Sequence, residues 1–259
     1  MMKDYGLVSI ITPSYNSSEF IADTIEAICN QTYKNWELLI TDDCSTDNTV
    51  EIVQGYMAKD KRIKLQRLEK NSGAGICRNK SIEVAQGRYI AFCDSDDVWM
   101  PQKLEMQLRF MEQKGCALAY SSYMIMDERK NVLGVSVCMN RIDLASMKRD
   151  DGIGCLTAIY DTSKVGKMYM APIRKRQDWG LWLEILAKCK VAYGLKEPLA
   201  YYRVRTGSIS NKKFALVKHN INVYRQILKY STLKAYLYFG FVFVPSYLLK
   251  KMRIRLNSL

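Results

Sequence analysis

Residues 89–97 read Tyr-Ile-Ala-Phe-Cys-Asp-Ser-Asp-Asp and carry more information about the fold than any other stretch of this chain. The first five form an apolar run of strand length, and three carboxylates occupy the next four positions. In an open α/β sheet, ligands bind in the crevice at the carboxyl ends of the strands. An Asp-x-Asp pair there offers the hard oxygen ligands that Mg²⁺ prefers. These carboxylates could instead form a turn or a helix cap. The rest of the sequence is needed to distinguish the two interpretations.

Strand-like runs alternate with helical periodicity through the first half of the chain. Strands are predicted at 7–12, 37–41, 63–68 and 89–93, and helices begin near residues 21, 49, 74 and 101. Strands that alternate with helices of about 10–15 residues indicate βαβ units and a parallel sheet. The sequence therefore predicts an α/β fold, Rossmann-like, with a mainly parallel central sheet flanked by helices.

The second half of the chain is less regular. A strand is predicted at 117–126, a helix at 178–189, and a strand, a turn and a second strand within 191–202. Without a repeat or a low-complexity linker, we expect one domain over residues 1–230. A basic, aromatic and helical extension is expected over residues 231–259.

Three polar turns follow three of the predicted strands. They are Thr12–Asn16, Asp42–Asp47 and Asp94–Asp97. Because the carboxyl ends of parallel strands meet at one edge of a sheet, these turns are expected to converge on one ligand. An aromatic ring with polar groups suits a nucleobase and ribose, and the carboxylates suit a metal-bound diphosphate.

Composition narrows the classes of function. The single histidine, His219, excludes a histidine-rich metal site and a Ser-His-Asp triad. Eight scattered cysteines without a Cys-x-x-Cys pair fit reduced thiols in the cytosol. The first residues lack the apolar region of a signal peptide. The net charge is +13, and the stretch from Pro198 to Leu259 has 12 basic residues and no acidic one. This part of the chain is therefore expected to meet an anionic partner, either nucleic acid or a membrane surface.

Other classes of protein share parts of these patterns. A dinucleotide-binding oxidoreductase needs Gly-x-Gly-x-x-Gly directly after the first strand, where this chain has Pro13-Ser-Tyr-Asn16. A nucleic-acid-binding protein is an alternative, which the interleaved Tyr and Arg residues at 201–203 and 224–225 favour. A protein that binds a nucleotide sugar without turnover is a further alternative. The acidic turns oppose nucleic acid, because they would face a polyanion.

The motifs resemble those of family 2 glycosyltransferases of the GT-A type, which are inverting enzymes of bacterial surface-polysaccharide assembly. The matching segments are 8–16, 41–49, 71–79, 89–101, 176–183 and 202–210. The resemblance covers roughly residues 6–212, and its first half is highly specific. It implies transfer of a hexose or an N-acetylhexosamine from a nucleotide-diphosphate donor, UDP-linked, to a hydroxyl of a glycan or lipid-linked acceptor.

The resemblance also implies roles for individual residues. The nucleotide sugar would be bound by Pro13, Tyr15, Asp42, Asp43, Asn71, Gly73, Arg78, Asp94 and Ser95. Asp42 would support its own turn. Asp94 and Asp96 would hold a divalent cation, Mn²⁺ or Mg²⁺. Asp97 would join them or cap the following helix. Asp178 would be the catalytic base.

This chain departs from the family pattern at two positions. Gln177 replaces a frequent Glu beside the expected base, which is kept. Arg205 stands where the family often has His. A guanidinium has no free lone pair for a metal, although it can pair with a phosphate.

The acceptor and the location are also expectations. Residues 154–158 and Trp179 would face the acceptor, with the Trp179 ring against a sugar, whereas Trp182 would lie in the core. The apolar and aromatic segment 235–249 is shorter than the roughly 20 residues of a spanning helix. Flanked by Lys and Arg, it favours peripheral attachment to the cytoplasmic face of the inner membrane, through anionic lipids. Packing on the domain is the alternative.

Overall fold

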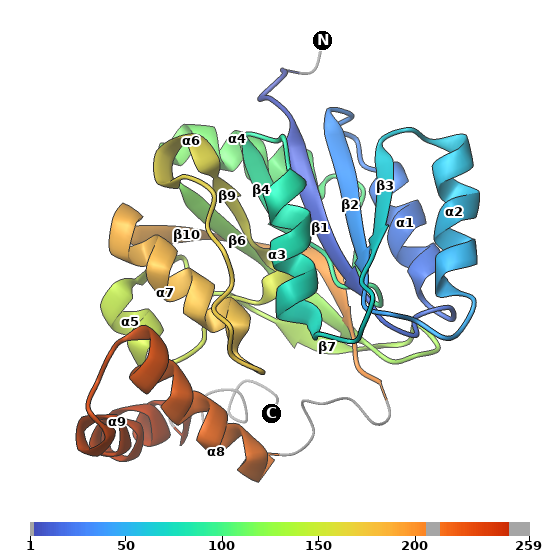
Figure 1. The fold of residues 1–259 in the computed structure, drawn as a ribbon. Helices are drawn as coiled ribbons and strands as arrows, with labels where there is room; N and C mark the ends of the chain where they lie inside the picture. The colour runs from blue at the N-terminus through green and yellow to red at the C-terminus, as the bar shows by residue number, and fades with distance from the viewer. Residues whose placement is uncertain (1–2, 206–212, 249–259) are drawn as a thin grey trace.

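The computed structural model describes residues 3–205 and 213–248 of the 259-residue chain. In the first half, the strands and helices alternate as predicted (Figure 1). They are β1 Val8–Ser14, α1 Ile21–Cys29, β2 Trp36–Asp42, α2 Thr49–Lys59, β3 Ile63–Arg67, α3 Ala74–Val84, β4 Tyr89–Phe92, β5 Val98–Trp99 and α4 Lys103–Lys114.

The second half adds shorter elements and the C-terminal helices. They are β6 Leu118–Met126, β7 Val132–Ser136, β8 Arg141–Asp143, α5 Leu144–Arg149, the 3₁₀ turn η1 Cys155–Thr157, β9 Ile159–Asp161, α6 Thr162–Val165, α7 Gln177–Cys189, β10 Val191–Arg203, α8 Lys213–Asn222, η3 Val223–Ile227, α9 Thr232–Tyr238 and η4 Phe239–Phe243. Segments η3 and η4 are π-helical.

One sheet runs through the molecule, in the order β3-β2-β1-β4-β9-β6-β10-β5. Strands β3, β2, β1 and β4 are parallel, as predicted. Strand β9 lies antiparallel between β4 and β6, whereas β10 returns parallel to β6. The sheet is thus mixed but mainly parallel, and its parallel half places the ends of β1, β2 and β4 at one edge.

The prediction of two strands and a turn within 191–202 is wrong. Residues 191–203 form a single strand, β10, which pairs with β6 along its length. Its register shifts on both sides of Pro198, because proline has no N–H to donate to the ladder. The irregularity that indicated a turn is therefore a bulge within a continuous strand.

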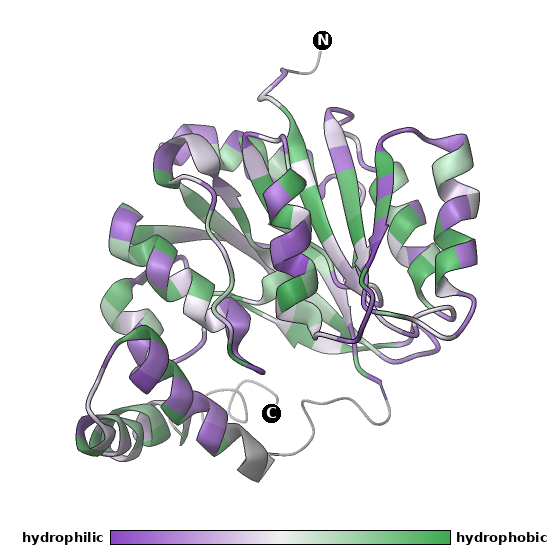
Figure 2. Ribbon diagram, in the orientation of Figure 1, coloured by the Kyte–Doolittle hydropathy of each residue, from purple (hydrophilic) through white to green (hydrophobic). Residues whose placement is uncertain are grey.

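Apolar side chains on the two faces of the sheet form two cores. Successive residues of a strand point to opposite faces, so Ile10 belongs to one core and Ile11 to the other. Helices α1 and α4 cover the face that includes Ile10. Helices α3, α5 and α7 cover the face that includes Ile11, and α8 and α9 lie beyond α5 and α7 (Figures 1 and 2).

A lysine is buried between α4 and η1. The Lys103 ammonium group donates to Gln107 Oε1, lies 3.5 Å from Thr157 O, and sits 4.4 Å from the centroid of the Trp99 ring. Burial lowers the pKa of Lys103 to about 7. The folded protein therefore favours the neutral amine, whereas the unfolded chain stays protonated up to about pH 10.4.

Lys103→Met is expected to flatten the pH dependence of stability. Between pH 7 and about 10.4 the unfolded chain binds the extra proton, so wild-type stability should rise with pH in this window. Relative to the variant, wild type should gain up to ~1.4 kcal/mol per pH unit. Urea unfolding at pH 7, 8 and 9 measures the two slopes. Equal slopes would show that Lys103 is protonated in the folded state.

Candidate active site

The three polar turns meet at the carboxyl edge of the parallel strands, as predicted. The Ser17 and Ser95 hydroxyls are 2.7 Å apart and join the β1 and β4 turns. Asn16 N–H donates to Ser45 Oγ at 2.9 Å and joins the β1 and β2 turns. Asn16 and Cys44 have positive φ values of 45° and 66°. Such conformations are rare outside glycine and cluster at functional sites.

The expected nucleoside region divides into exposed and supporting residues. Tyr15 is half exposed at the tip of its turn, and Pro13 is buried just before it. Asp42 is fully buried; its carboxylate accepts hydrogen bonds from Ser45 N at 2.9 Å and Ser45 Oγ at 2.5 Å. Tyr15 can therefore meet a ligand, while Asp42 shapes the turn.

Asp43 ties the β2 turn to the glycine loop. Its carboxylate accepts hydrogen bonds from the backbone N–H groups of Ser72 at 2.7 Å and Gly73 at 2.8 Å. Gly73, with φ of 91°, adopts a conformation that few other residues hold, and it directly precedes α3. Asn71 is exposed, and its amide donates to Asp43 O at 3.3 Å. The loop thus holds Asn71 at the surface beside Asp43.

Two arginines neutralise the acidic turn. The buried Arg78, on α3, pairs with Asp94 at 2.5 Å. Arg205 lies 3.4 Å from Asp96, so it faces the turn as a phosphate-binding group would. Burial and the nearby charge of Asp94 raise the pKa of Asp96. The turn therefore concentrates negative charge, and only part of it is offset.

Asp97 and Arg203 form a connection that the sequence analysis missed. Asp97 is buried, and its Oδ1 accepts the backbone N–H of Arg203 at 3.1 Å. Arg203 Nε donates to Asp96 O at 2.8 Å. The helix-cap alternative for Asp97 is wrong, since its carboxylate binds Arg203, and it is Gln31 that accepts the backbone N–H of Leu104 at the start of α4. The two residues instead fix the end of β10 against the acidic turn. A contact between residues so far apart in the sequence cannot be predicted from a local sequence pattern.

Asp178 reaches the same edge from α7. It is the second residue of that helix and is partly exposed. Its carboxylate lies close enough to the Arg78 guanidinium and the Cys155 thiol to act on both electrostatically. A Cβ added to Gly75, at the start of α3, would lie 2.6 Å from the Gln177 side chain. The start of α7 is therefore packed against the start of α3, beside the acidic turn.

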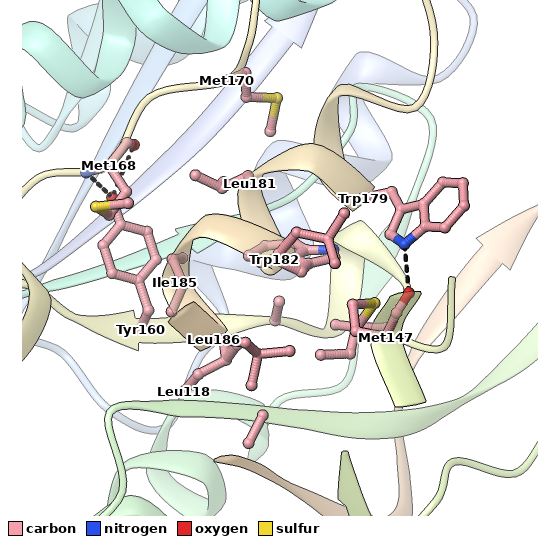
Figure 3. Packing of buried hydrophobic residues seen from close by; sticks show 14 of the residues in the cluster. Leu118, Met147, Tyr160, Met168, Met170, Trp179, Leu181, Trp182, Ile185 and Leu186 are labelled. Atoms are coloured by element: carbon pink, nitrogen blue, oxygen red, sulfur yellow. Dashed lines mark hydrogen bonds between the residues drawn. The ribbon is translucent and has the colours of Figure 1, made fainter. Parts of the chain in front are cut away.

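Trp179 does not face an acceptor, which corrects the prediction. Its side chain is fully buried, and Nε1 donates to Met147 O at 2.7 Å (Figure 3). Its ring meets those of Tyr224 and Phe243, at centroid distances of 5.6 and 5.8 Å. No ring face is left for a sugar. Trp182 lies in the core, as predicted.

The segment 154–158 is mostly buried as well. Leu156, Thr157 and Ala158 lie inside, so only Gly154 and Cys155 can face a ligand. Trp99 Nε1 donates to Leu156 O at 3.1 Å, which fixes this segment from the sheet. Of the five residues predicted to face the acceptor, only Gly154 and Cys155 are accessible.

The acidic turn fits a cation that is shared with a ligand. In the described ranges, no group of three or more His, Cys, Asp or Glu side chains is placed to hold a metal. Mg²⁺, however, often keeps only one or two protein carboxylates beside substrate phosphates. Asp94 and Asp96 supply two. Burial and the nearby charge of Asp94 raise the pKa of Asp96, and a bound cation would favour its ionised form.

Comparison with known proteins adds sequence relatives. The model of Glycosyl transferase family 2 matches residues 9–151. TuaG of Bacillus subtilis (strain 168), whose assignment to teichuronic acid biosynthesis is provisional, is 44% identical over 88% of this chain and 91% of TuaG. WfgD of Escherichia coli, a UDP-Glc:α-D-GlcNAc-diphosphoundecaprenol β-1,3-glucosyltransferase, is 39% identical over 86% of each chain.

Solved structures confirm the predicted fold. Residues 1–349 of TarS of S. aureus, in complex with UDP-GlcNAc, superpose with a TM-score of 0.70 at 23% identity, over 85% of this chain and 65% of that chain. PcManGT of Pyrobaculum calidifontis, a mannosyltransferase in complex with GDP-Man and Mn²⁺, gives 0.65 at 14% identity, over 90% and 69% of the two chains. At this identity the likeness concerns the GT-A fold alone.

The sequence motifs, the converging turns and the relatives thus agree. The family model covers more than half of the chain, and the curated relatives match it nearly from end to end. This chain belongs to glycosyltransferase family 2 and is a nucleotide-sugar glycosyltransferase.

Proposed function

We propose that the protein transfers a hexose, with inversion, from a UDP-sugar to a hydroxyl of a lipid-diphosphate-linked saccharide. The observation that carries the proposal is the meeting of Tyr15, the acidic turn and Asp178 at one edge of the sheet. The activity of WfgD, at 39% identity, supports both the UDP-linked donor and the lipid-linked acceptor. TuaG supports a place in surface-polysaccharide assembly.

The donor would lie across the three turns. Tyr15 is exposed where a nucleobase needs a ring, and Asp43 with Asn71 and Gly73 would border the base and ribose. Arg78 would orient Asp94, because its buried guanidinium pairs with that carboxylate at 2.5 Å. Arg205 would turn from Asp96 to a donor phosphate, which accepts a guanidinium at least as well.

Asp178 would act as the general base. A carboxylate at this position can accept the proton of the acceptor hydroxyl while that oxygen attacks the anomeric carbon. Attack from the face opposite the leaving diphosphate inverts the anomeric configuration. Because Asp178 is partly exposed, an incoming hydroxyl can reach it.

Asp94 and Asp96 would hold the divalent cation, Mn²⁺ or Mg²⁺, together with the donor diphosphate. Such a cation, when bound, stabilises the negative charge that develops on a leaving diphosphate. The Mn²⁺ in the PcManGT complex supports this assignment. The protein's own part is to keep two carboxylates close together despite their repulsion, through Arg78 and the Asp97–Arg203 contact.

We further propose a peripheral location on the cytoplasmic face of the inner membrane, where a lipid-linked acceptor is accessible. In the described part of the chain, no helix combines the length and the apolarity that crossing a bilayer requires. Residues 1–230 would form the catalytic domain, and 231–259 the attachment segment. Lys250, Lys251, Arg253 and Arg255 of that segment, and 206–210 of the family motif, lie outside the described residues.

Asp96→Ala is expected to weaken UDP binding at least tenfold when Mn²⁺ is present and to change it little in EDTA. The reason is that Asp96 would act on the diphosphate through the cation. Isothermal titration with UDP, with and without metal, measures both affinities. Glu51→Ala, at an exposed position of α2, is the matched control. If wild type binds UDP equally well in Mn²⁺ and in EDTA, the metal assignment is wrong.

A further inference from the structure

The C-terminal helices are fixed to the catalytic domain through one face. Ala235 and Phe243 are buried in the core, and the Tyr238 ring packs on Tyr224 at a centroid distance of 5.0 Å. Ser231 caps α9 by accepting the backbone N–H of Lys234. The segment from α9 through η4 is therefore held in a defined orientation, with its other face directed away from the domain.

That other face is apolar and exposed. Phe241 is 78% and Leu233 71% exposed, and Tyr236, Leu237 and Leu248 are about half exposed. Leu233, Leu237 and Phe241 border a shallow, apolar hollow of about 380 Å³. Single exposed apolar residues need no explanation, but contiguous ones mark an interaction surface. We call the surface formed by Leu233, Tyr236, Leu237, Phe241 and Leu248 the apolar ridge.

Basic residues accompany the apolar ridge. Lys234 lies within it, and Arg225 and Lys229 are exposed on the preceding turn. From Pro198 to the C-terminus the sequence has no acidic residue. An apolar protein partner would gain nothing from this one-sided charge. An anionic bilayer would attract each basic residue by about 1 kcal/mol close to the surface.

We propose that the apolar ridge is a membrane-docking surface, which inserts into the interface of an anionic lipid bilayer. Aromatic and aliphatic side chains with flanking Lys and Arg match the headgroup region, where the rings lie at the level of the lipid headgroups. The helices would lie in the plane of the interface. The packed face, with Ala235 and Phe243, stays on the protein.

Docking through the apolar ridge would bring α7, the helix that carries Asp178, close to the bilayer. Segments α8, η3 and η4 all contact the first turns of α7. Arg176 Nε donates to Asn220 at 3.0 Å, a Cβ added to Gly180 would lie 2.4 Å from Ile227, and Trp179 packs on Phe243. Asp178 lies between these contacts in the sequence. This orientation rests on the proposed function, since it explains how a lipid-linked acceptor reaches the base.

Flotation with phosphatidylglycerol–phosphatidylcholine vesicles tests the surface. Wild type should float with these vesicles and much less with pure phosphatidylcholine, because both the charge and the ridge contribute. The double variant Leu233→Asp with Phe241→Asp should reduce the floating fraction roughly tenfold or more, since two exposed apolar anchors are lost. Leu133→Asp is the matched control, because Leu133 is 61% exposed on β7, outside the ridge. It should float like wild type.

Each result decides for or against the ridge. A double variant that binds UDP like wild type but no longer floats supports the proposal and shows an intact donor site. Failure of wild type to float, or an equal loss in Leu133→Asp, would overturn it. A third outcome would also overturn it: light scattering shows a dimer for wild type and a monomer for the double variant, while both float equally well. A second copy of the chain would then cover the ridge. If wild type floats but does not bind UDP, the proposed function is wrong, whereas the proposal for the ridge still holds.

Discussion

Asp178→Asn is expected to lower sugar transfer by about 10²–10⁴-fold and to leave the affinity for UDP nearly unchanged. Asparagine keeps the shape of the side chain and can still donate or accept hydrogen bonds, but it cannot take the proton of the acceptor hydroxyl. Asp178 lies in the first turn of α7, near Arg78 and outside the three turns proposed to bind the donor, so removal of its charge should act on the chemical step. Single-turnover transfer and UDP titration measure the two quantities.

Glu184→Gln provides the control for this variant. Glu184 is an exposed carboxylate later in the same helix, and its neutralisation removes the same charge from α7. It should transfer sugar at the wild-type rate. A rate in Asp178→Asn that matches wild type would show that another group takes the proton, and the assignment of the base would be wrong.

Trp179→Ala is expected to lower the free energy of unfolding by about 3–5 kcal/mol. The whole indole is buried between Met147 on α5, Tyr224 on η3 and Phe243 on η4. Its removal opens a cavity among three elements and leaves Met147 O without its donor. Urea unfolding, followed by circular dichroism, gives the difference.

Trp179→Phe separates packing from hydrogen bonding. It keeps a ring against Tyr224 and loses only the Nε1 hydrogen bond and part of the volume, so its loss of stability should be clearly smaller. A sugar-binding role predicts a different pattern. Normal stability of Trp179→Ala combined with a raised KM for the acceptor alone would return this residue to the acceptor site.

The parallel half of the fold and its converging turns could be predicted because their signals are local. Each apolar run that ends in a polar turn, such as Tyr89–Asp97, reports a strand and the edge at which it ends. Parallel pairing then places the turns together, whatever the details of packing. Four of the six segments that match the family, 8–16, 41–49, 71–79 and 89–101, lie in this half, where the proposed donor would lie across the turns.

Predictions failed where the burial or the pairing of a residue depends on residues that are distant in sequence. The helical periodicity of α7 shows that Trp182 faces the core, but the burial of Trp179 depends on Tyr224 and Phe243, more than 40 residues away. Likewise, Pro198 suggests a turn, and only the pairing of β10 with β6 shows a bulged strand. The contact between Asp97 and Arg203 joins residues separated by 106 positions.

Transfer from UDP-glucose to a synthetic GlcNAc-diphospho-lipid is the reaction that the proposed function requires. Wild type, with Mn²⁺, should form a lipid-linked disaccharide with a β-glycosidic bond from the α-linked donor. A panel of UDP-linked hexoses and N-acetylhexosamines then identifies the donor, and Asp178→Asn serves as the inactive control. A protein that binds UDP, yet transfers no sugar from any donor of the panel to this acceptor, would contradict the account.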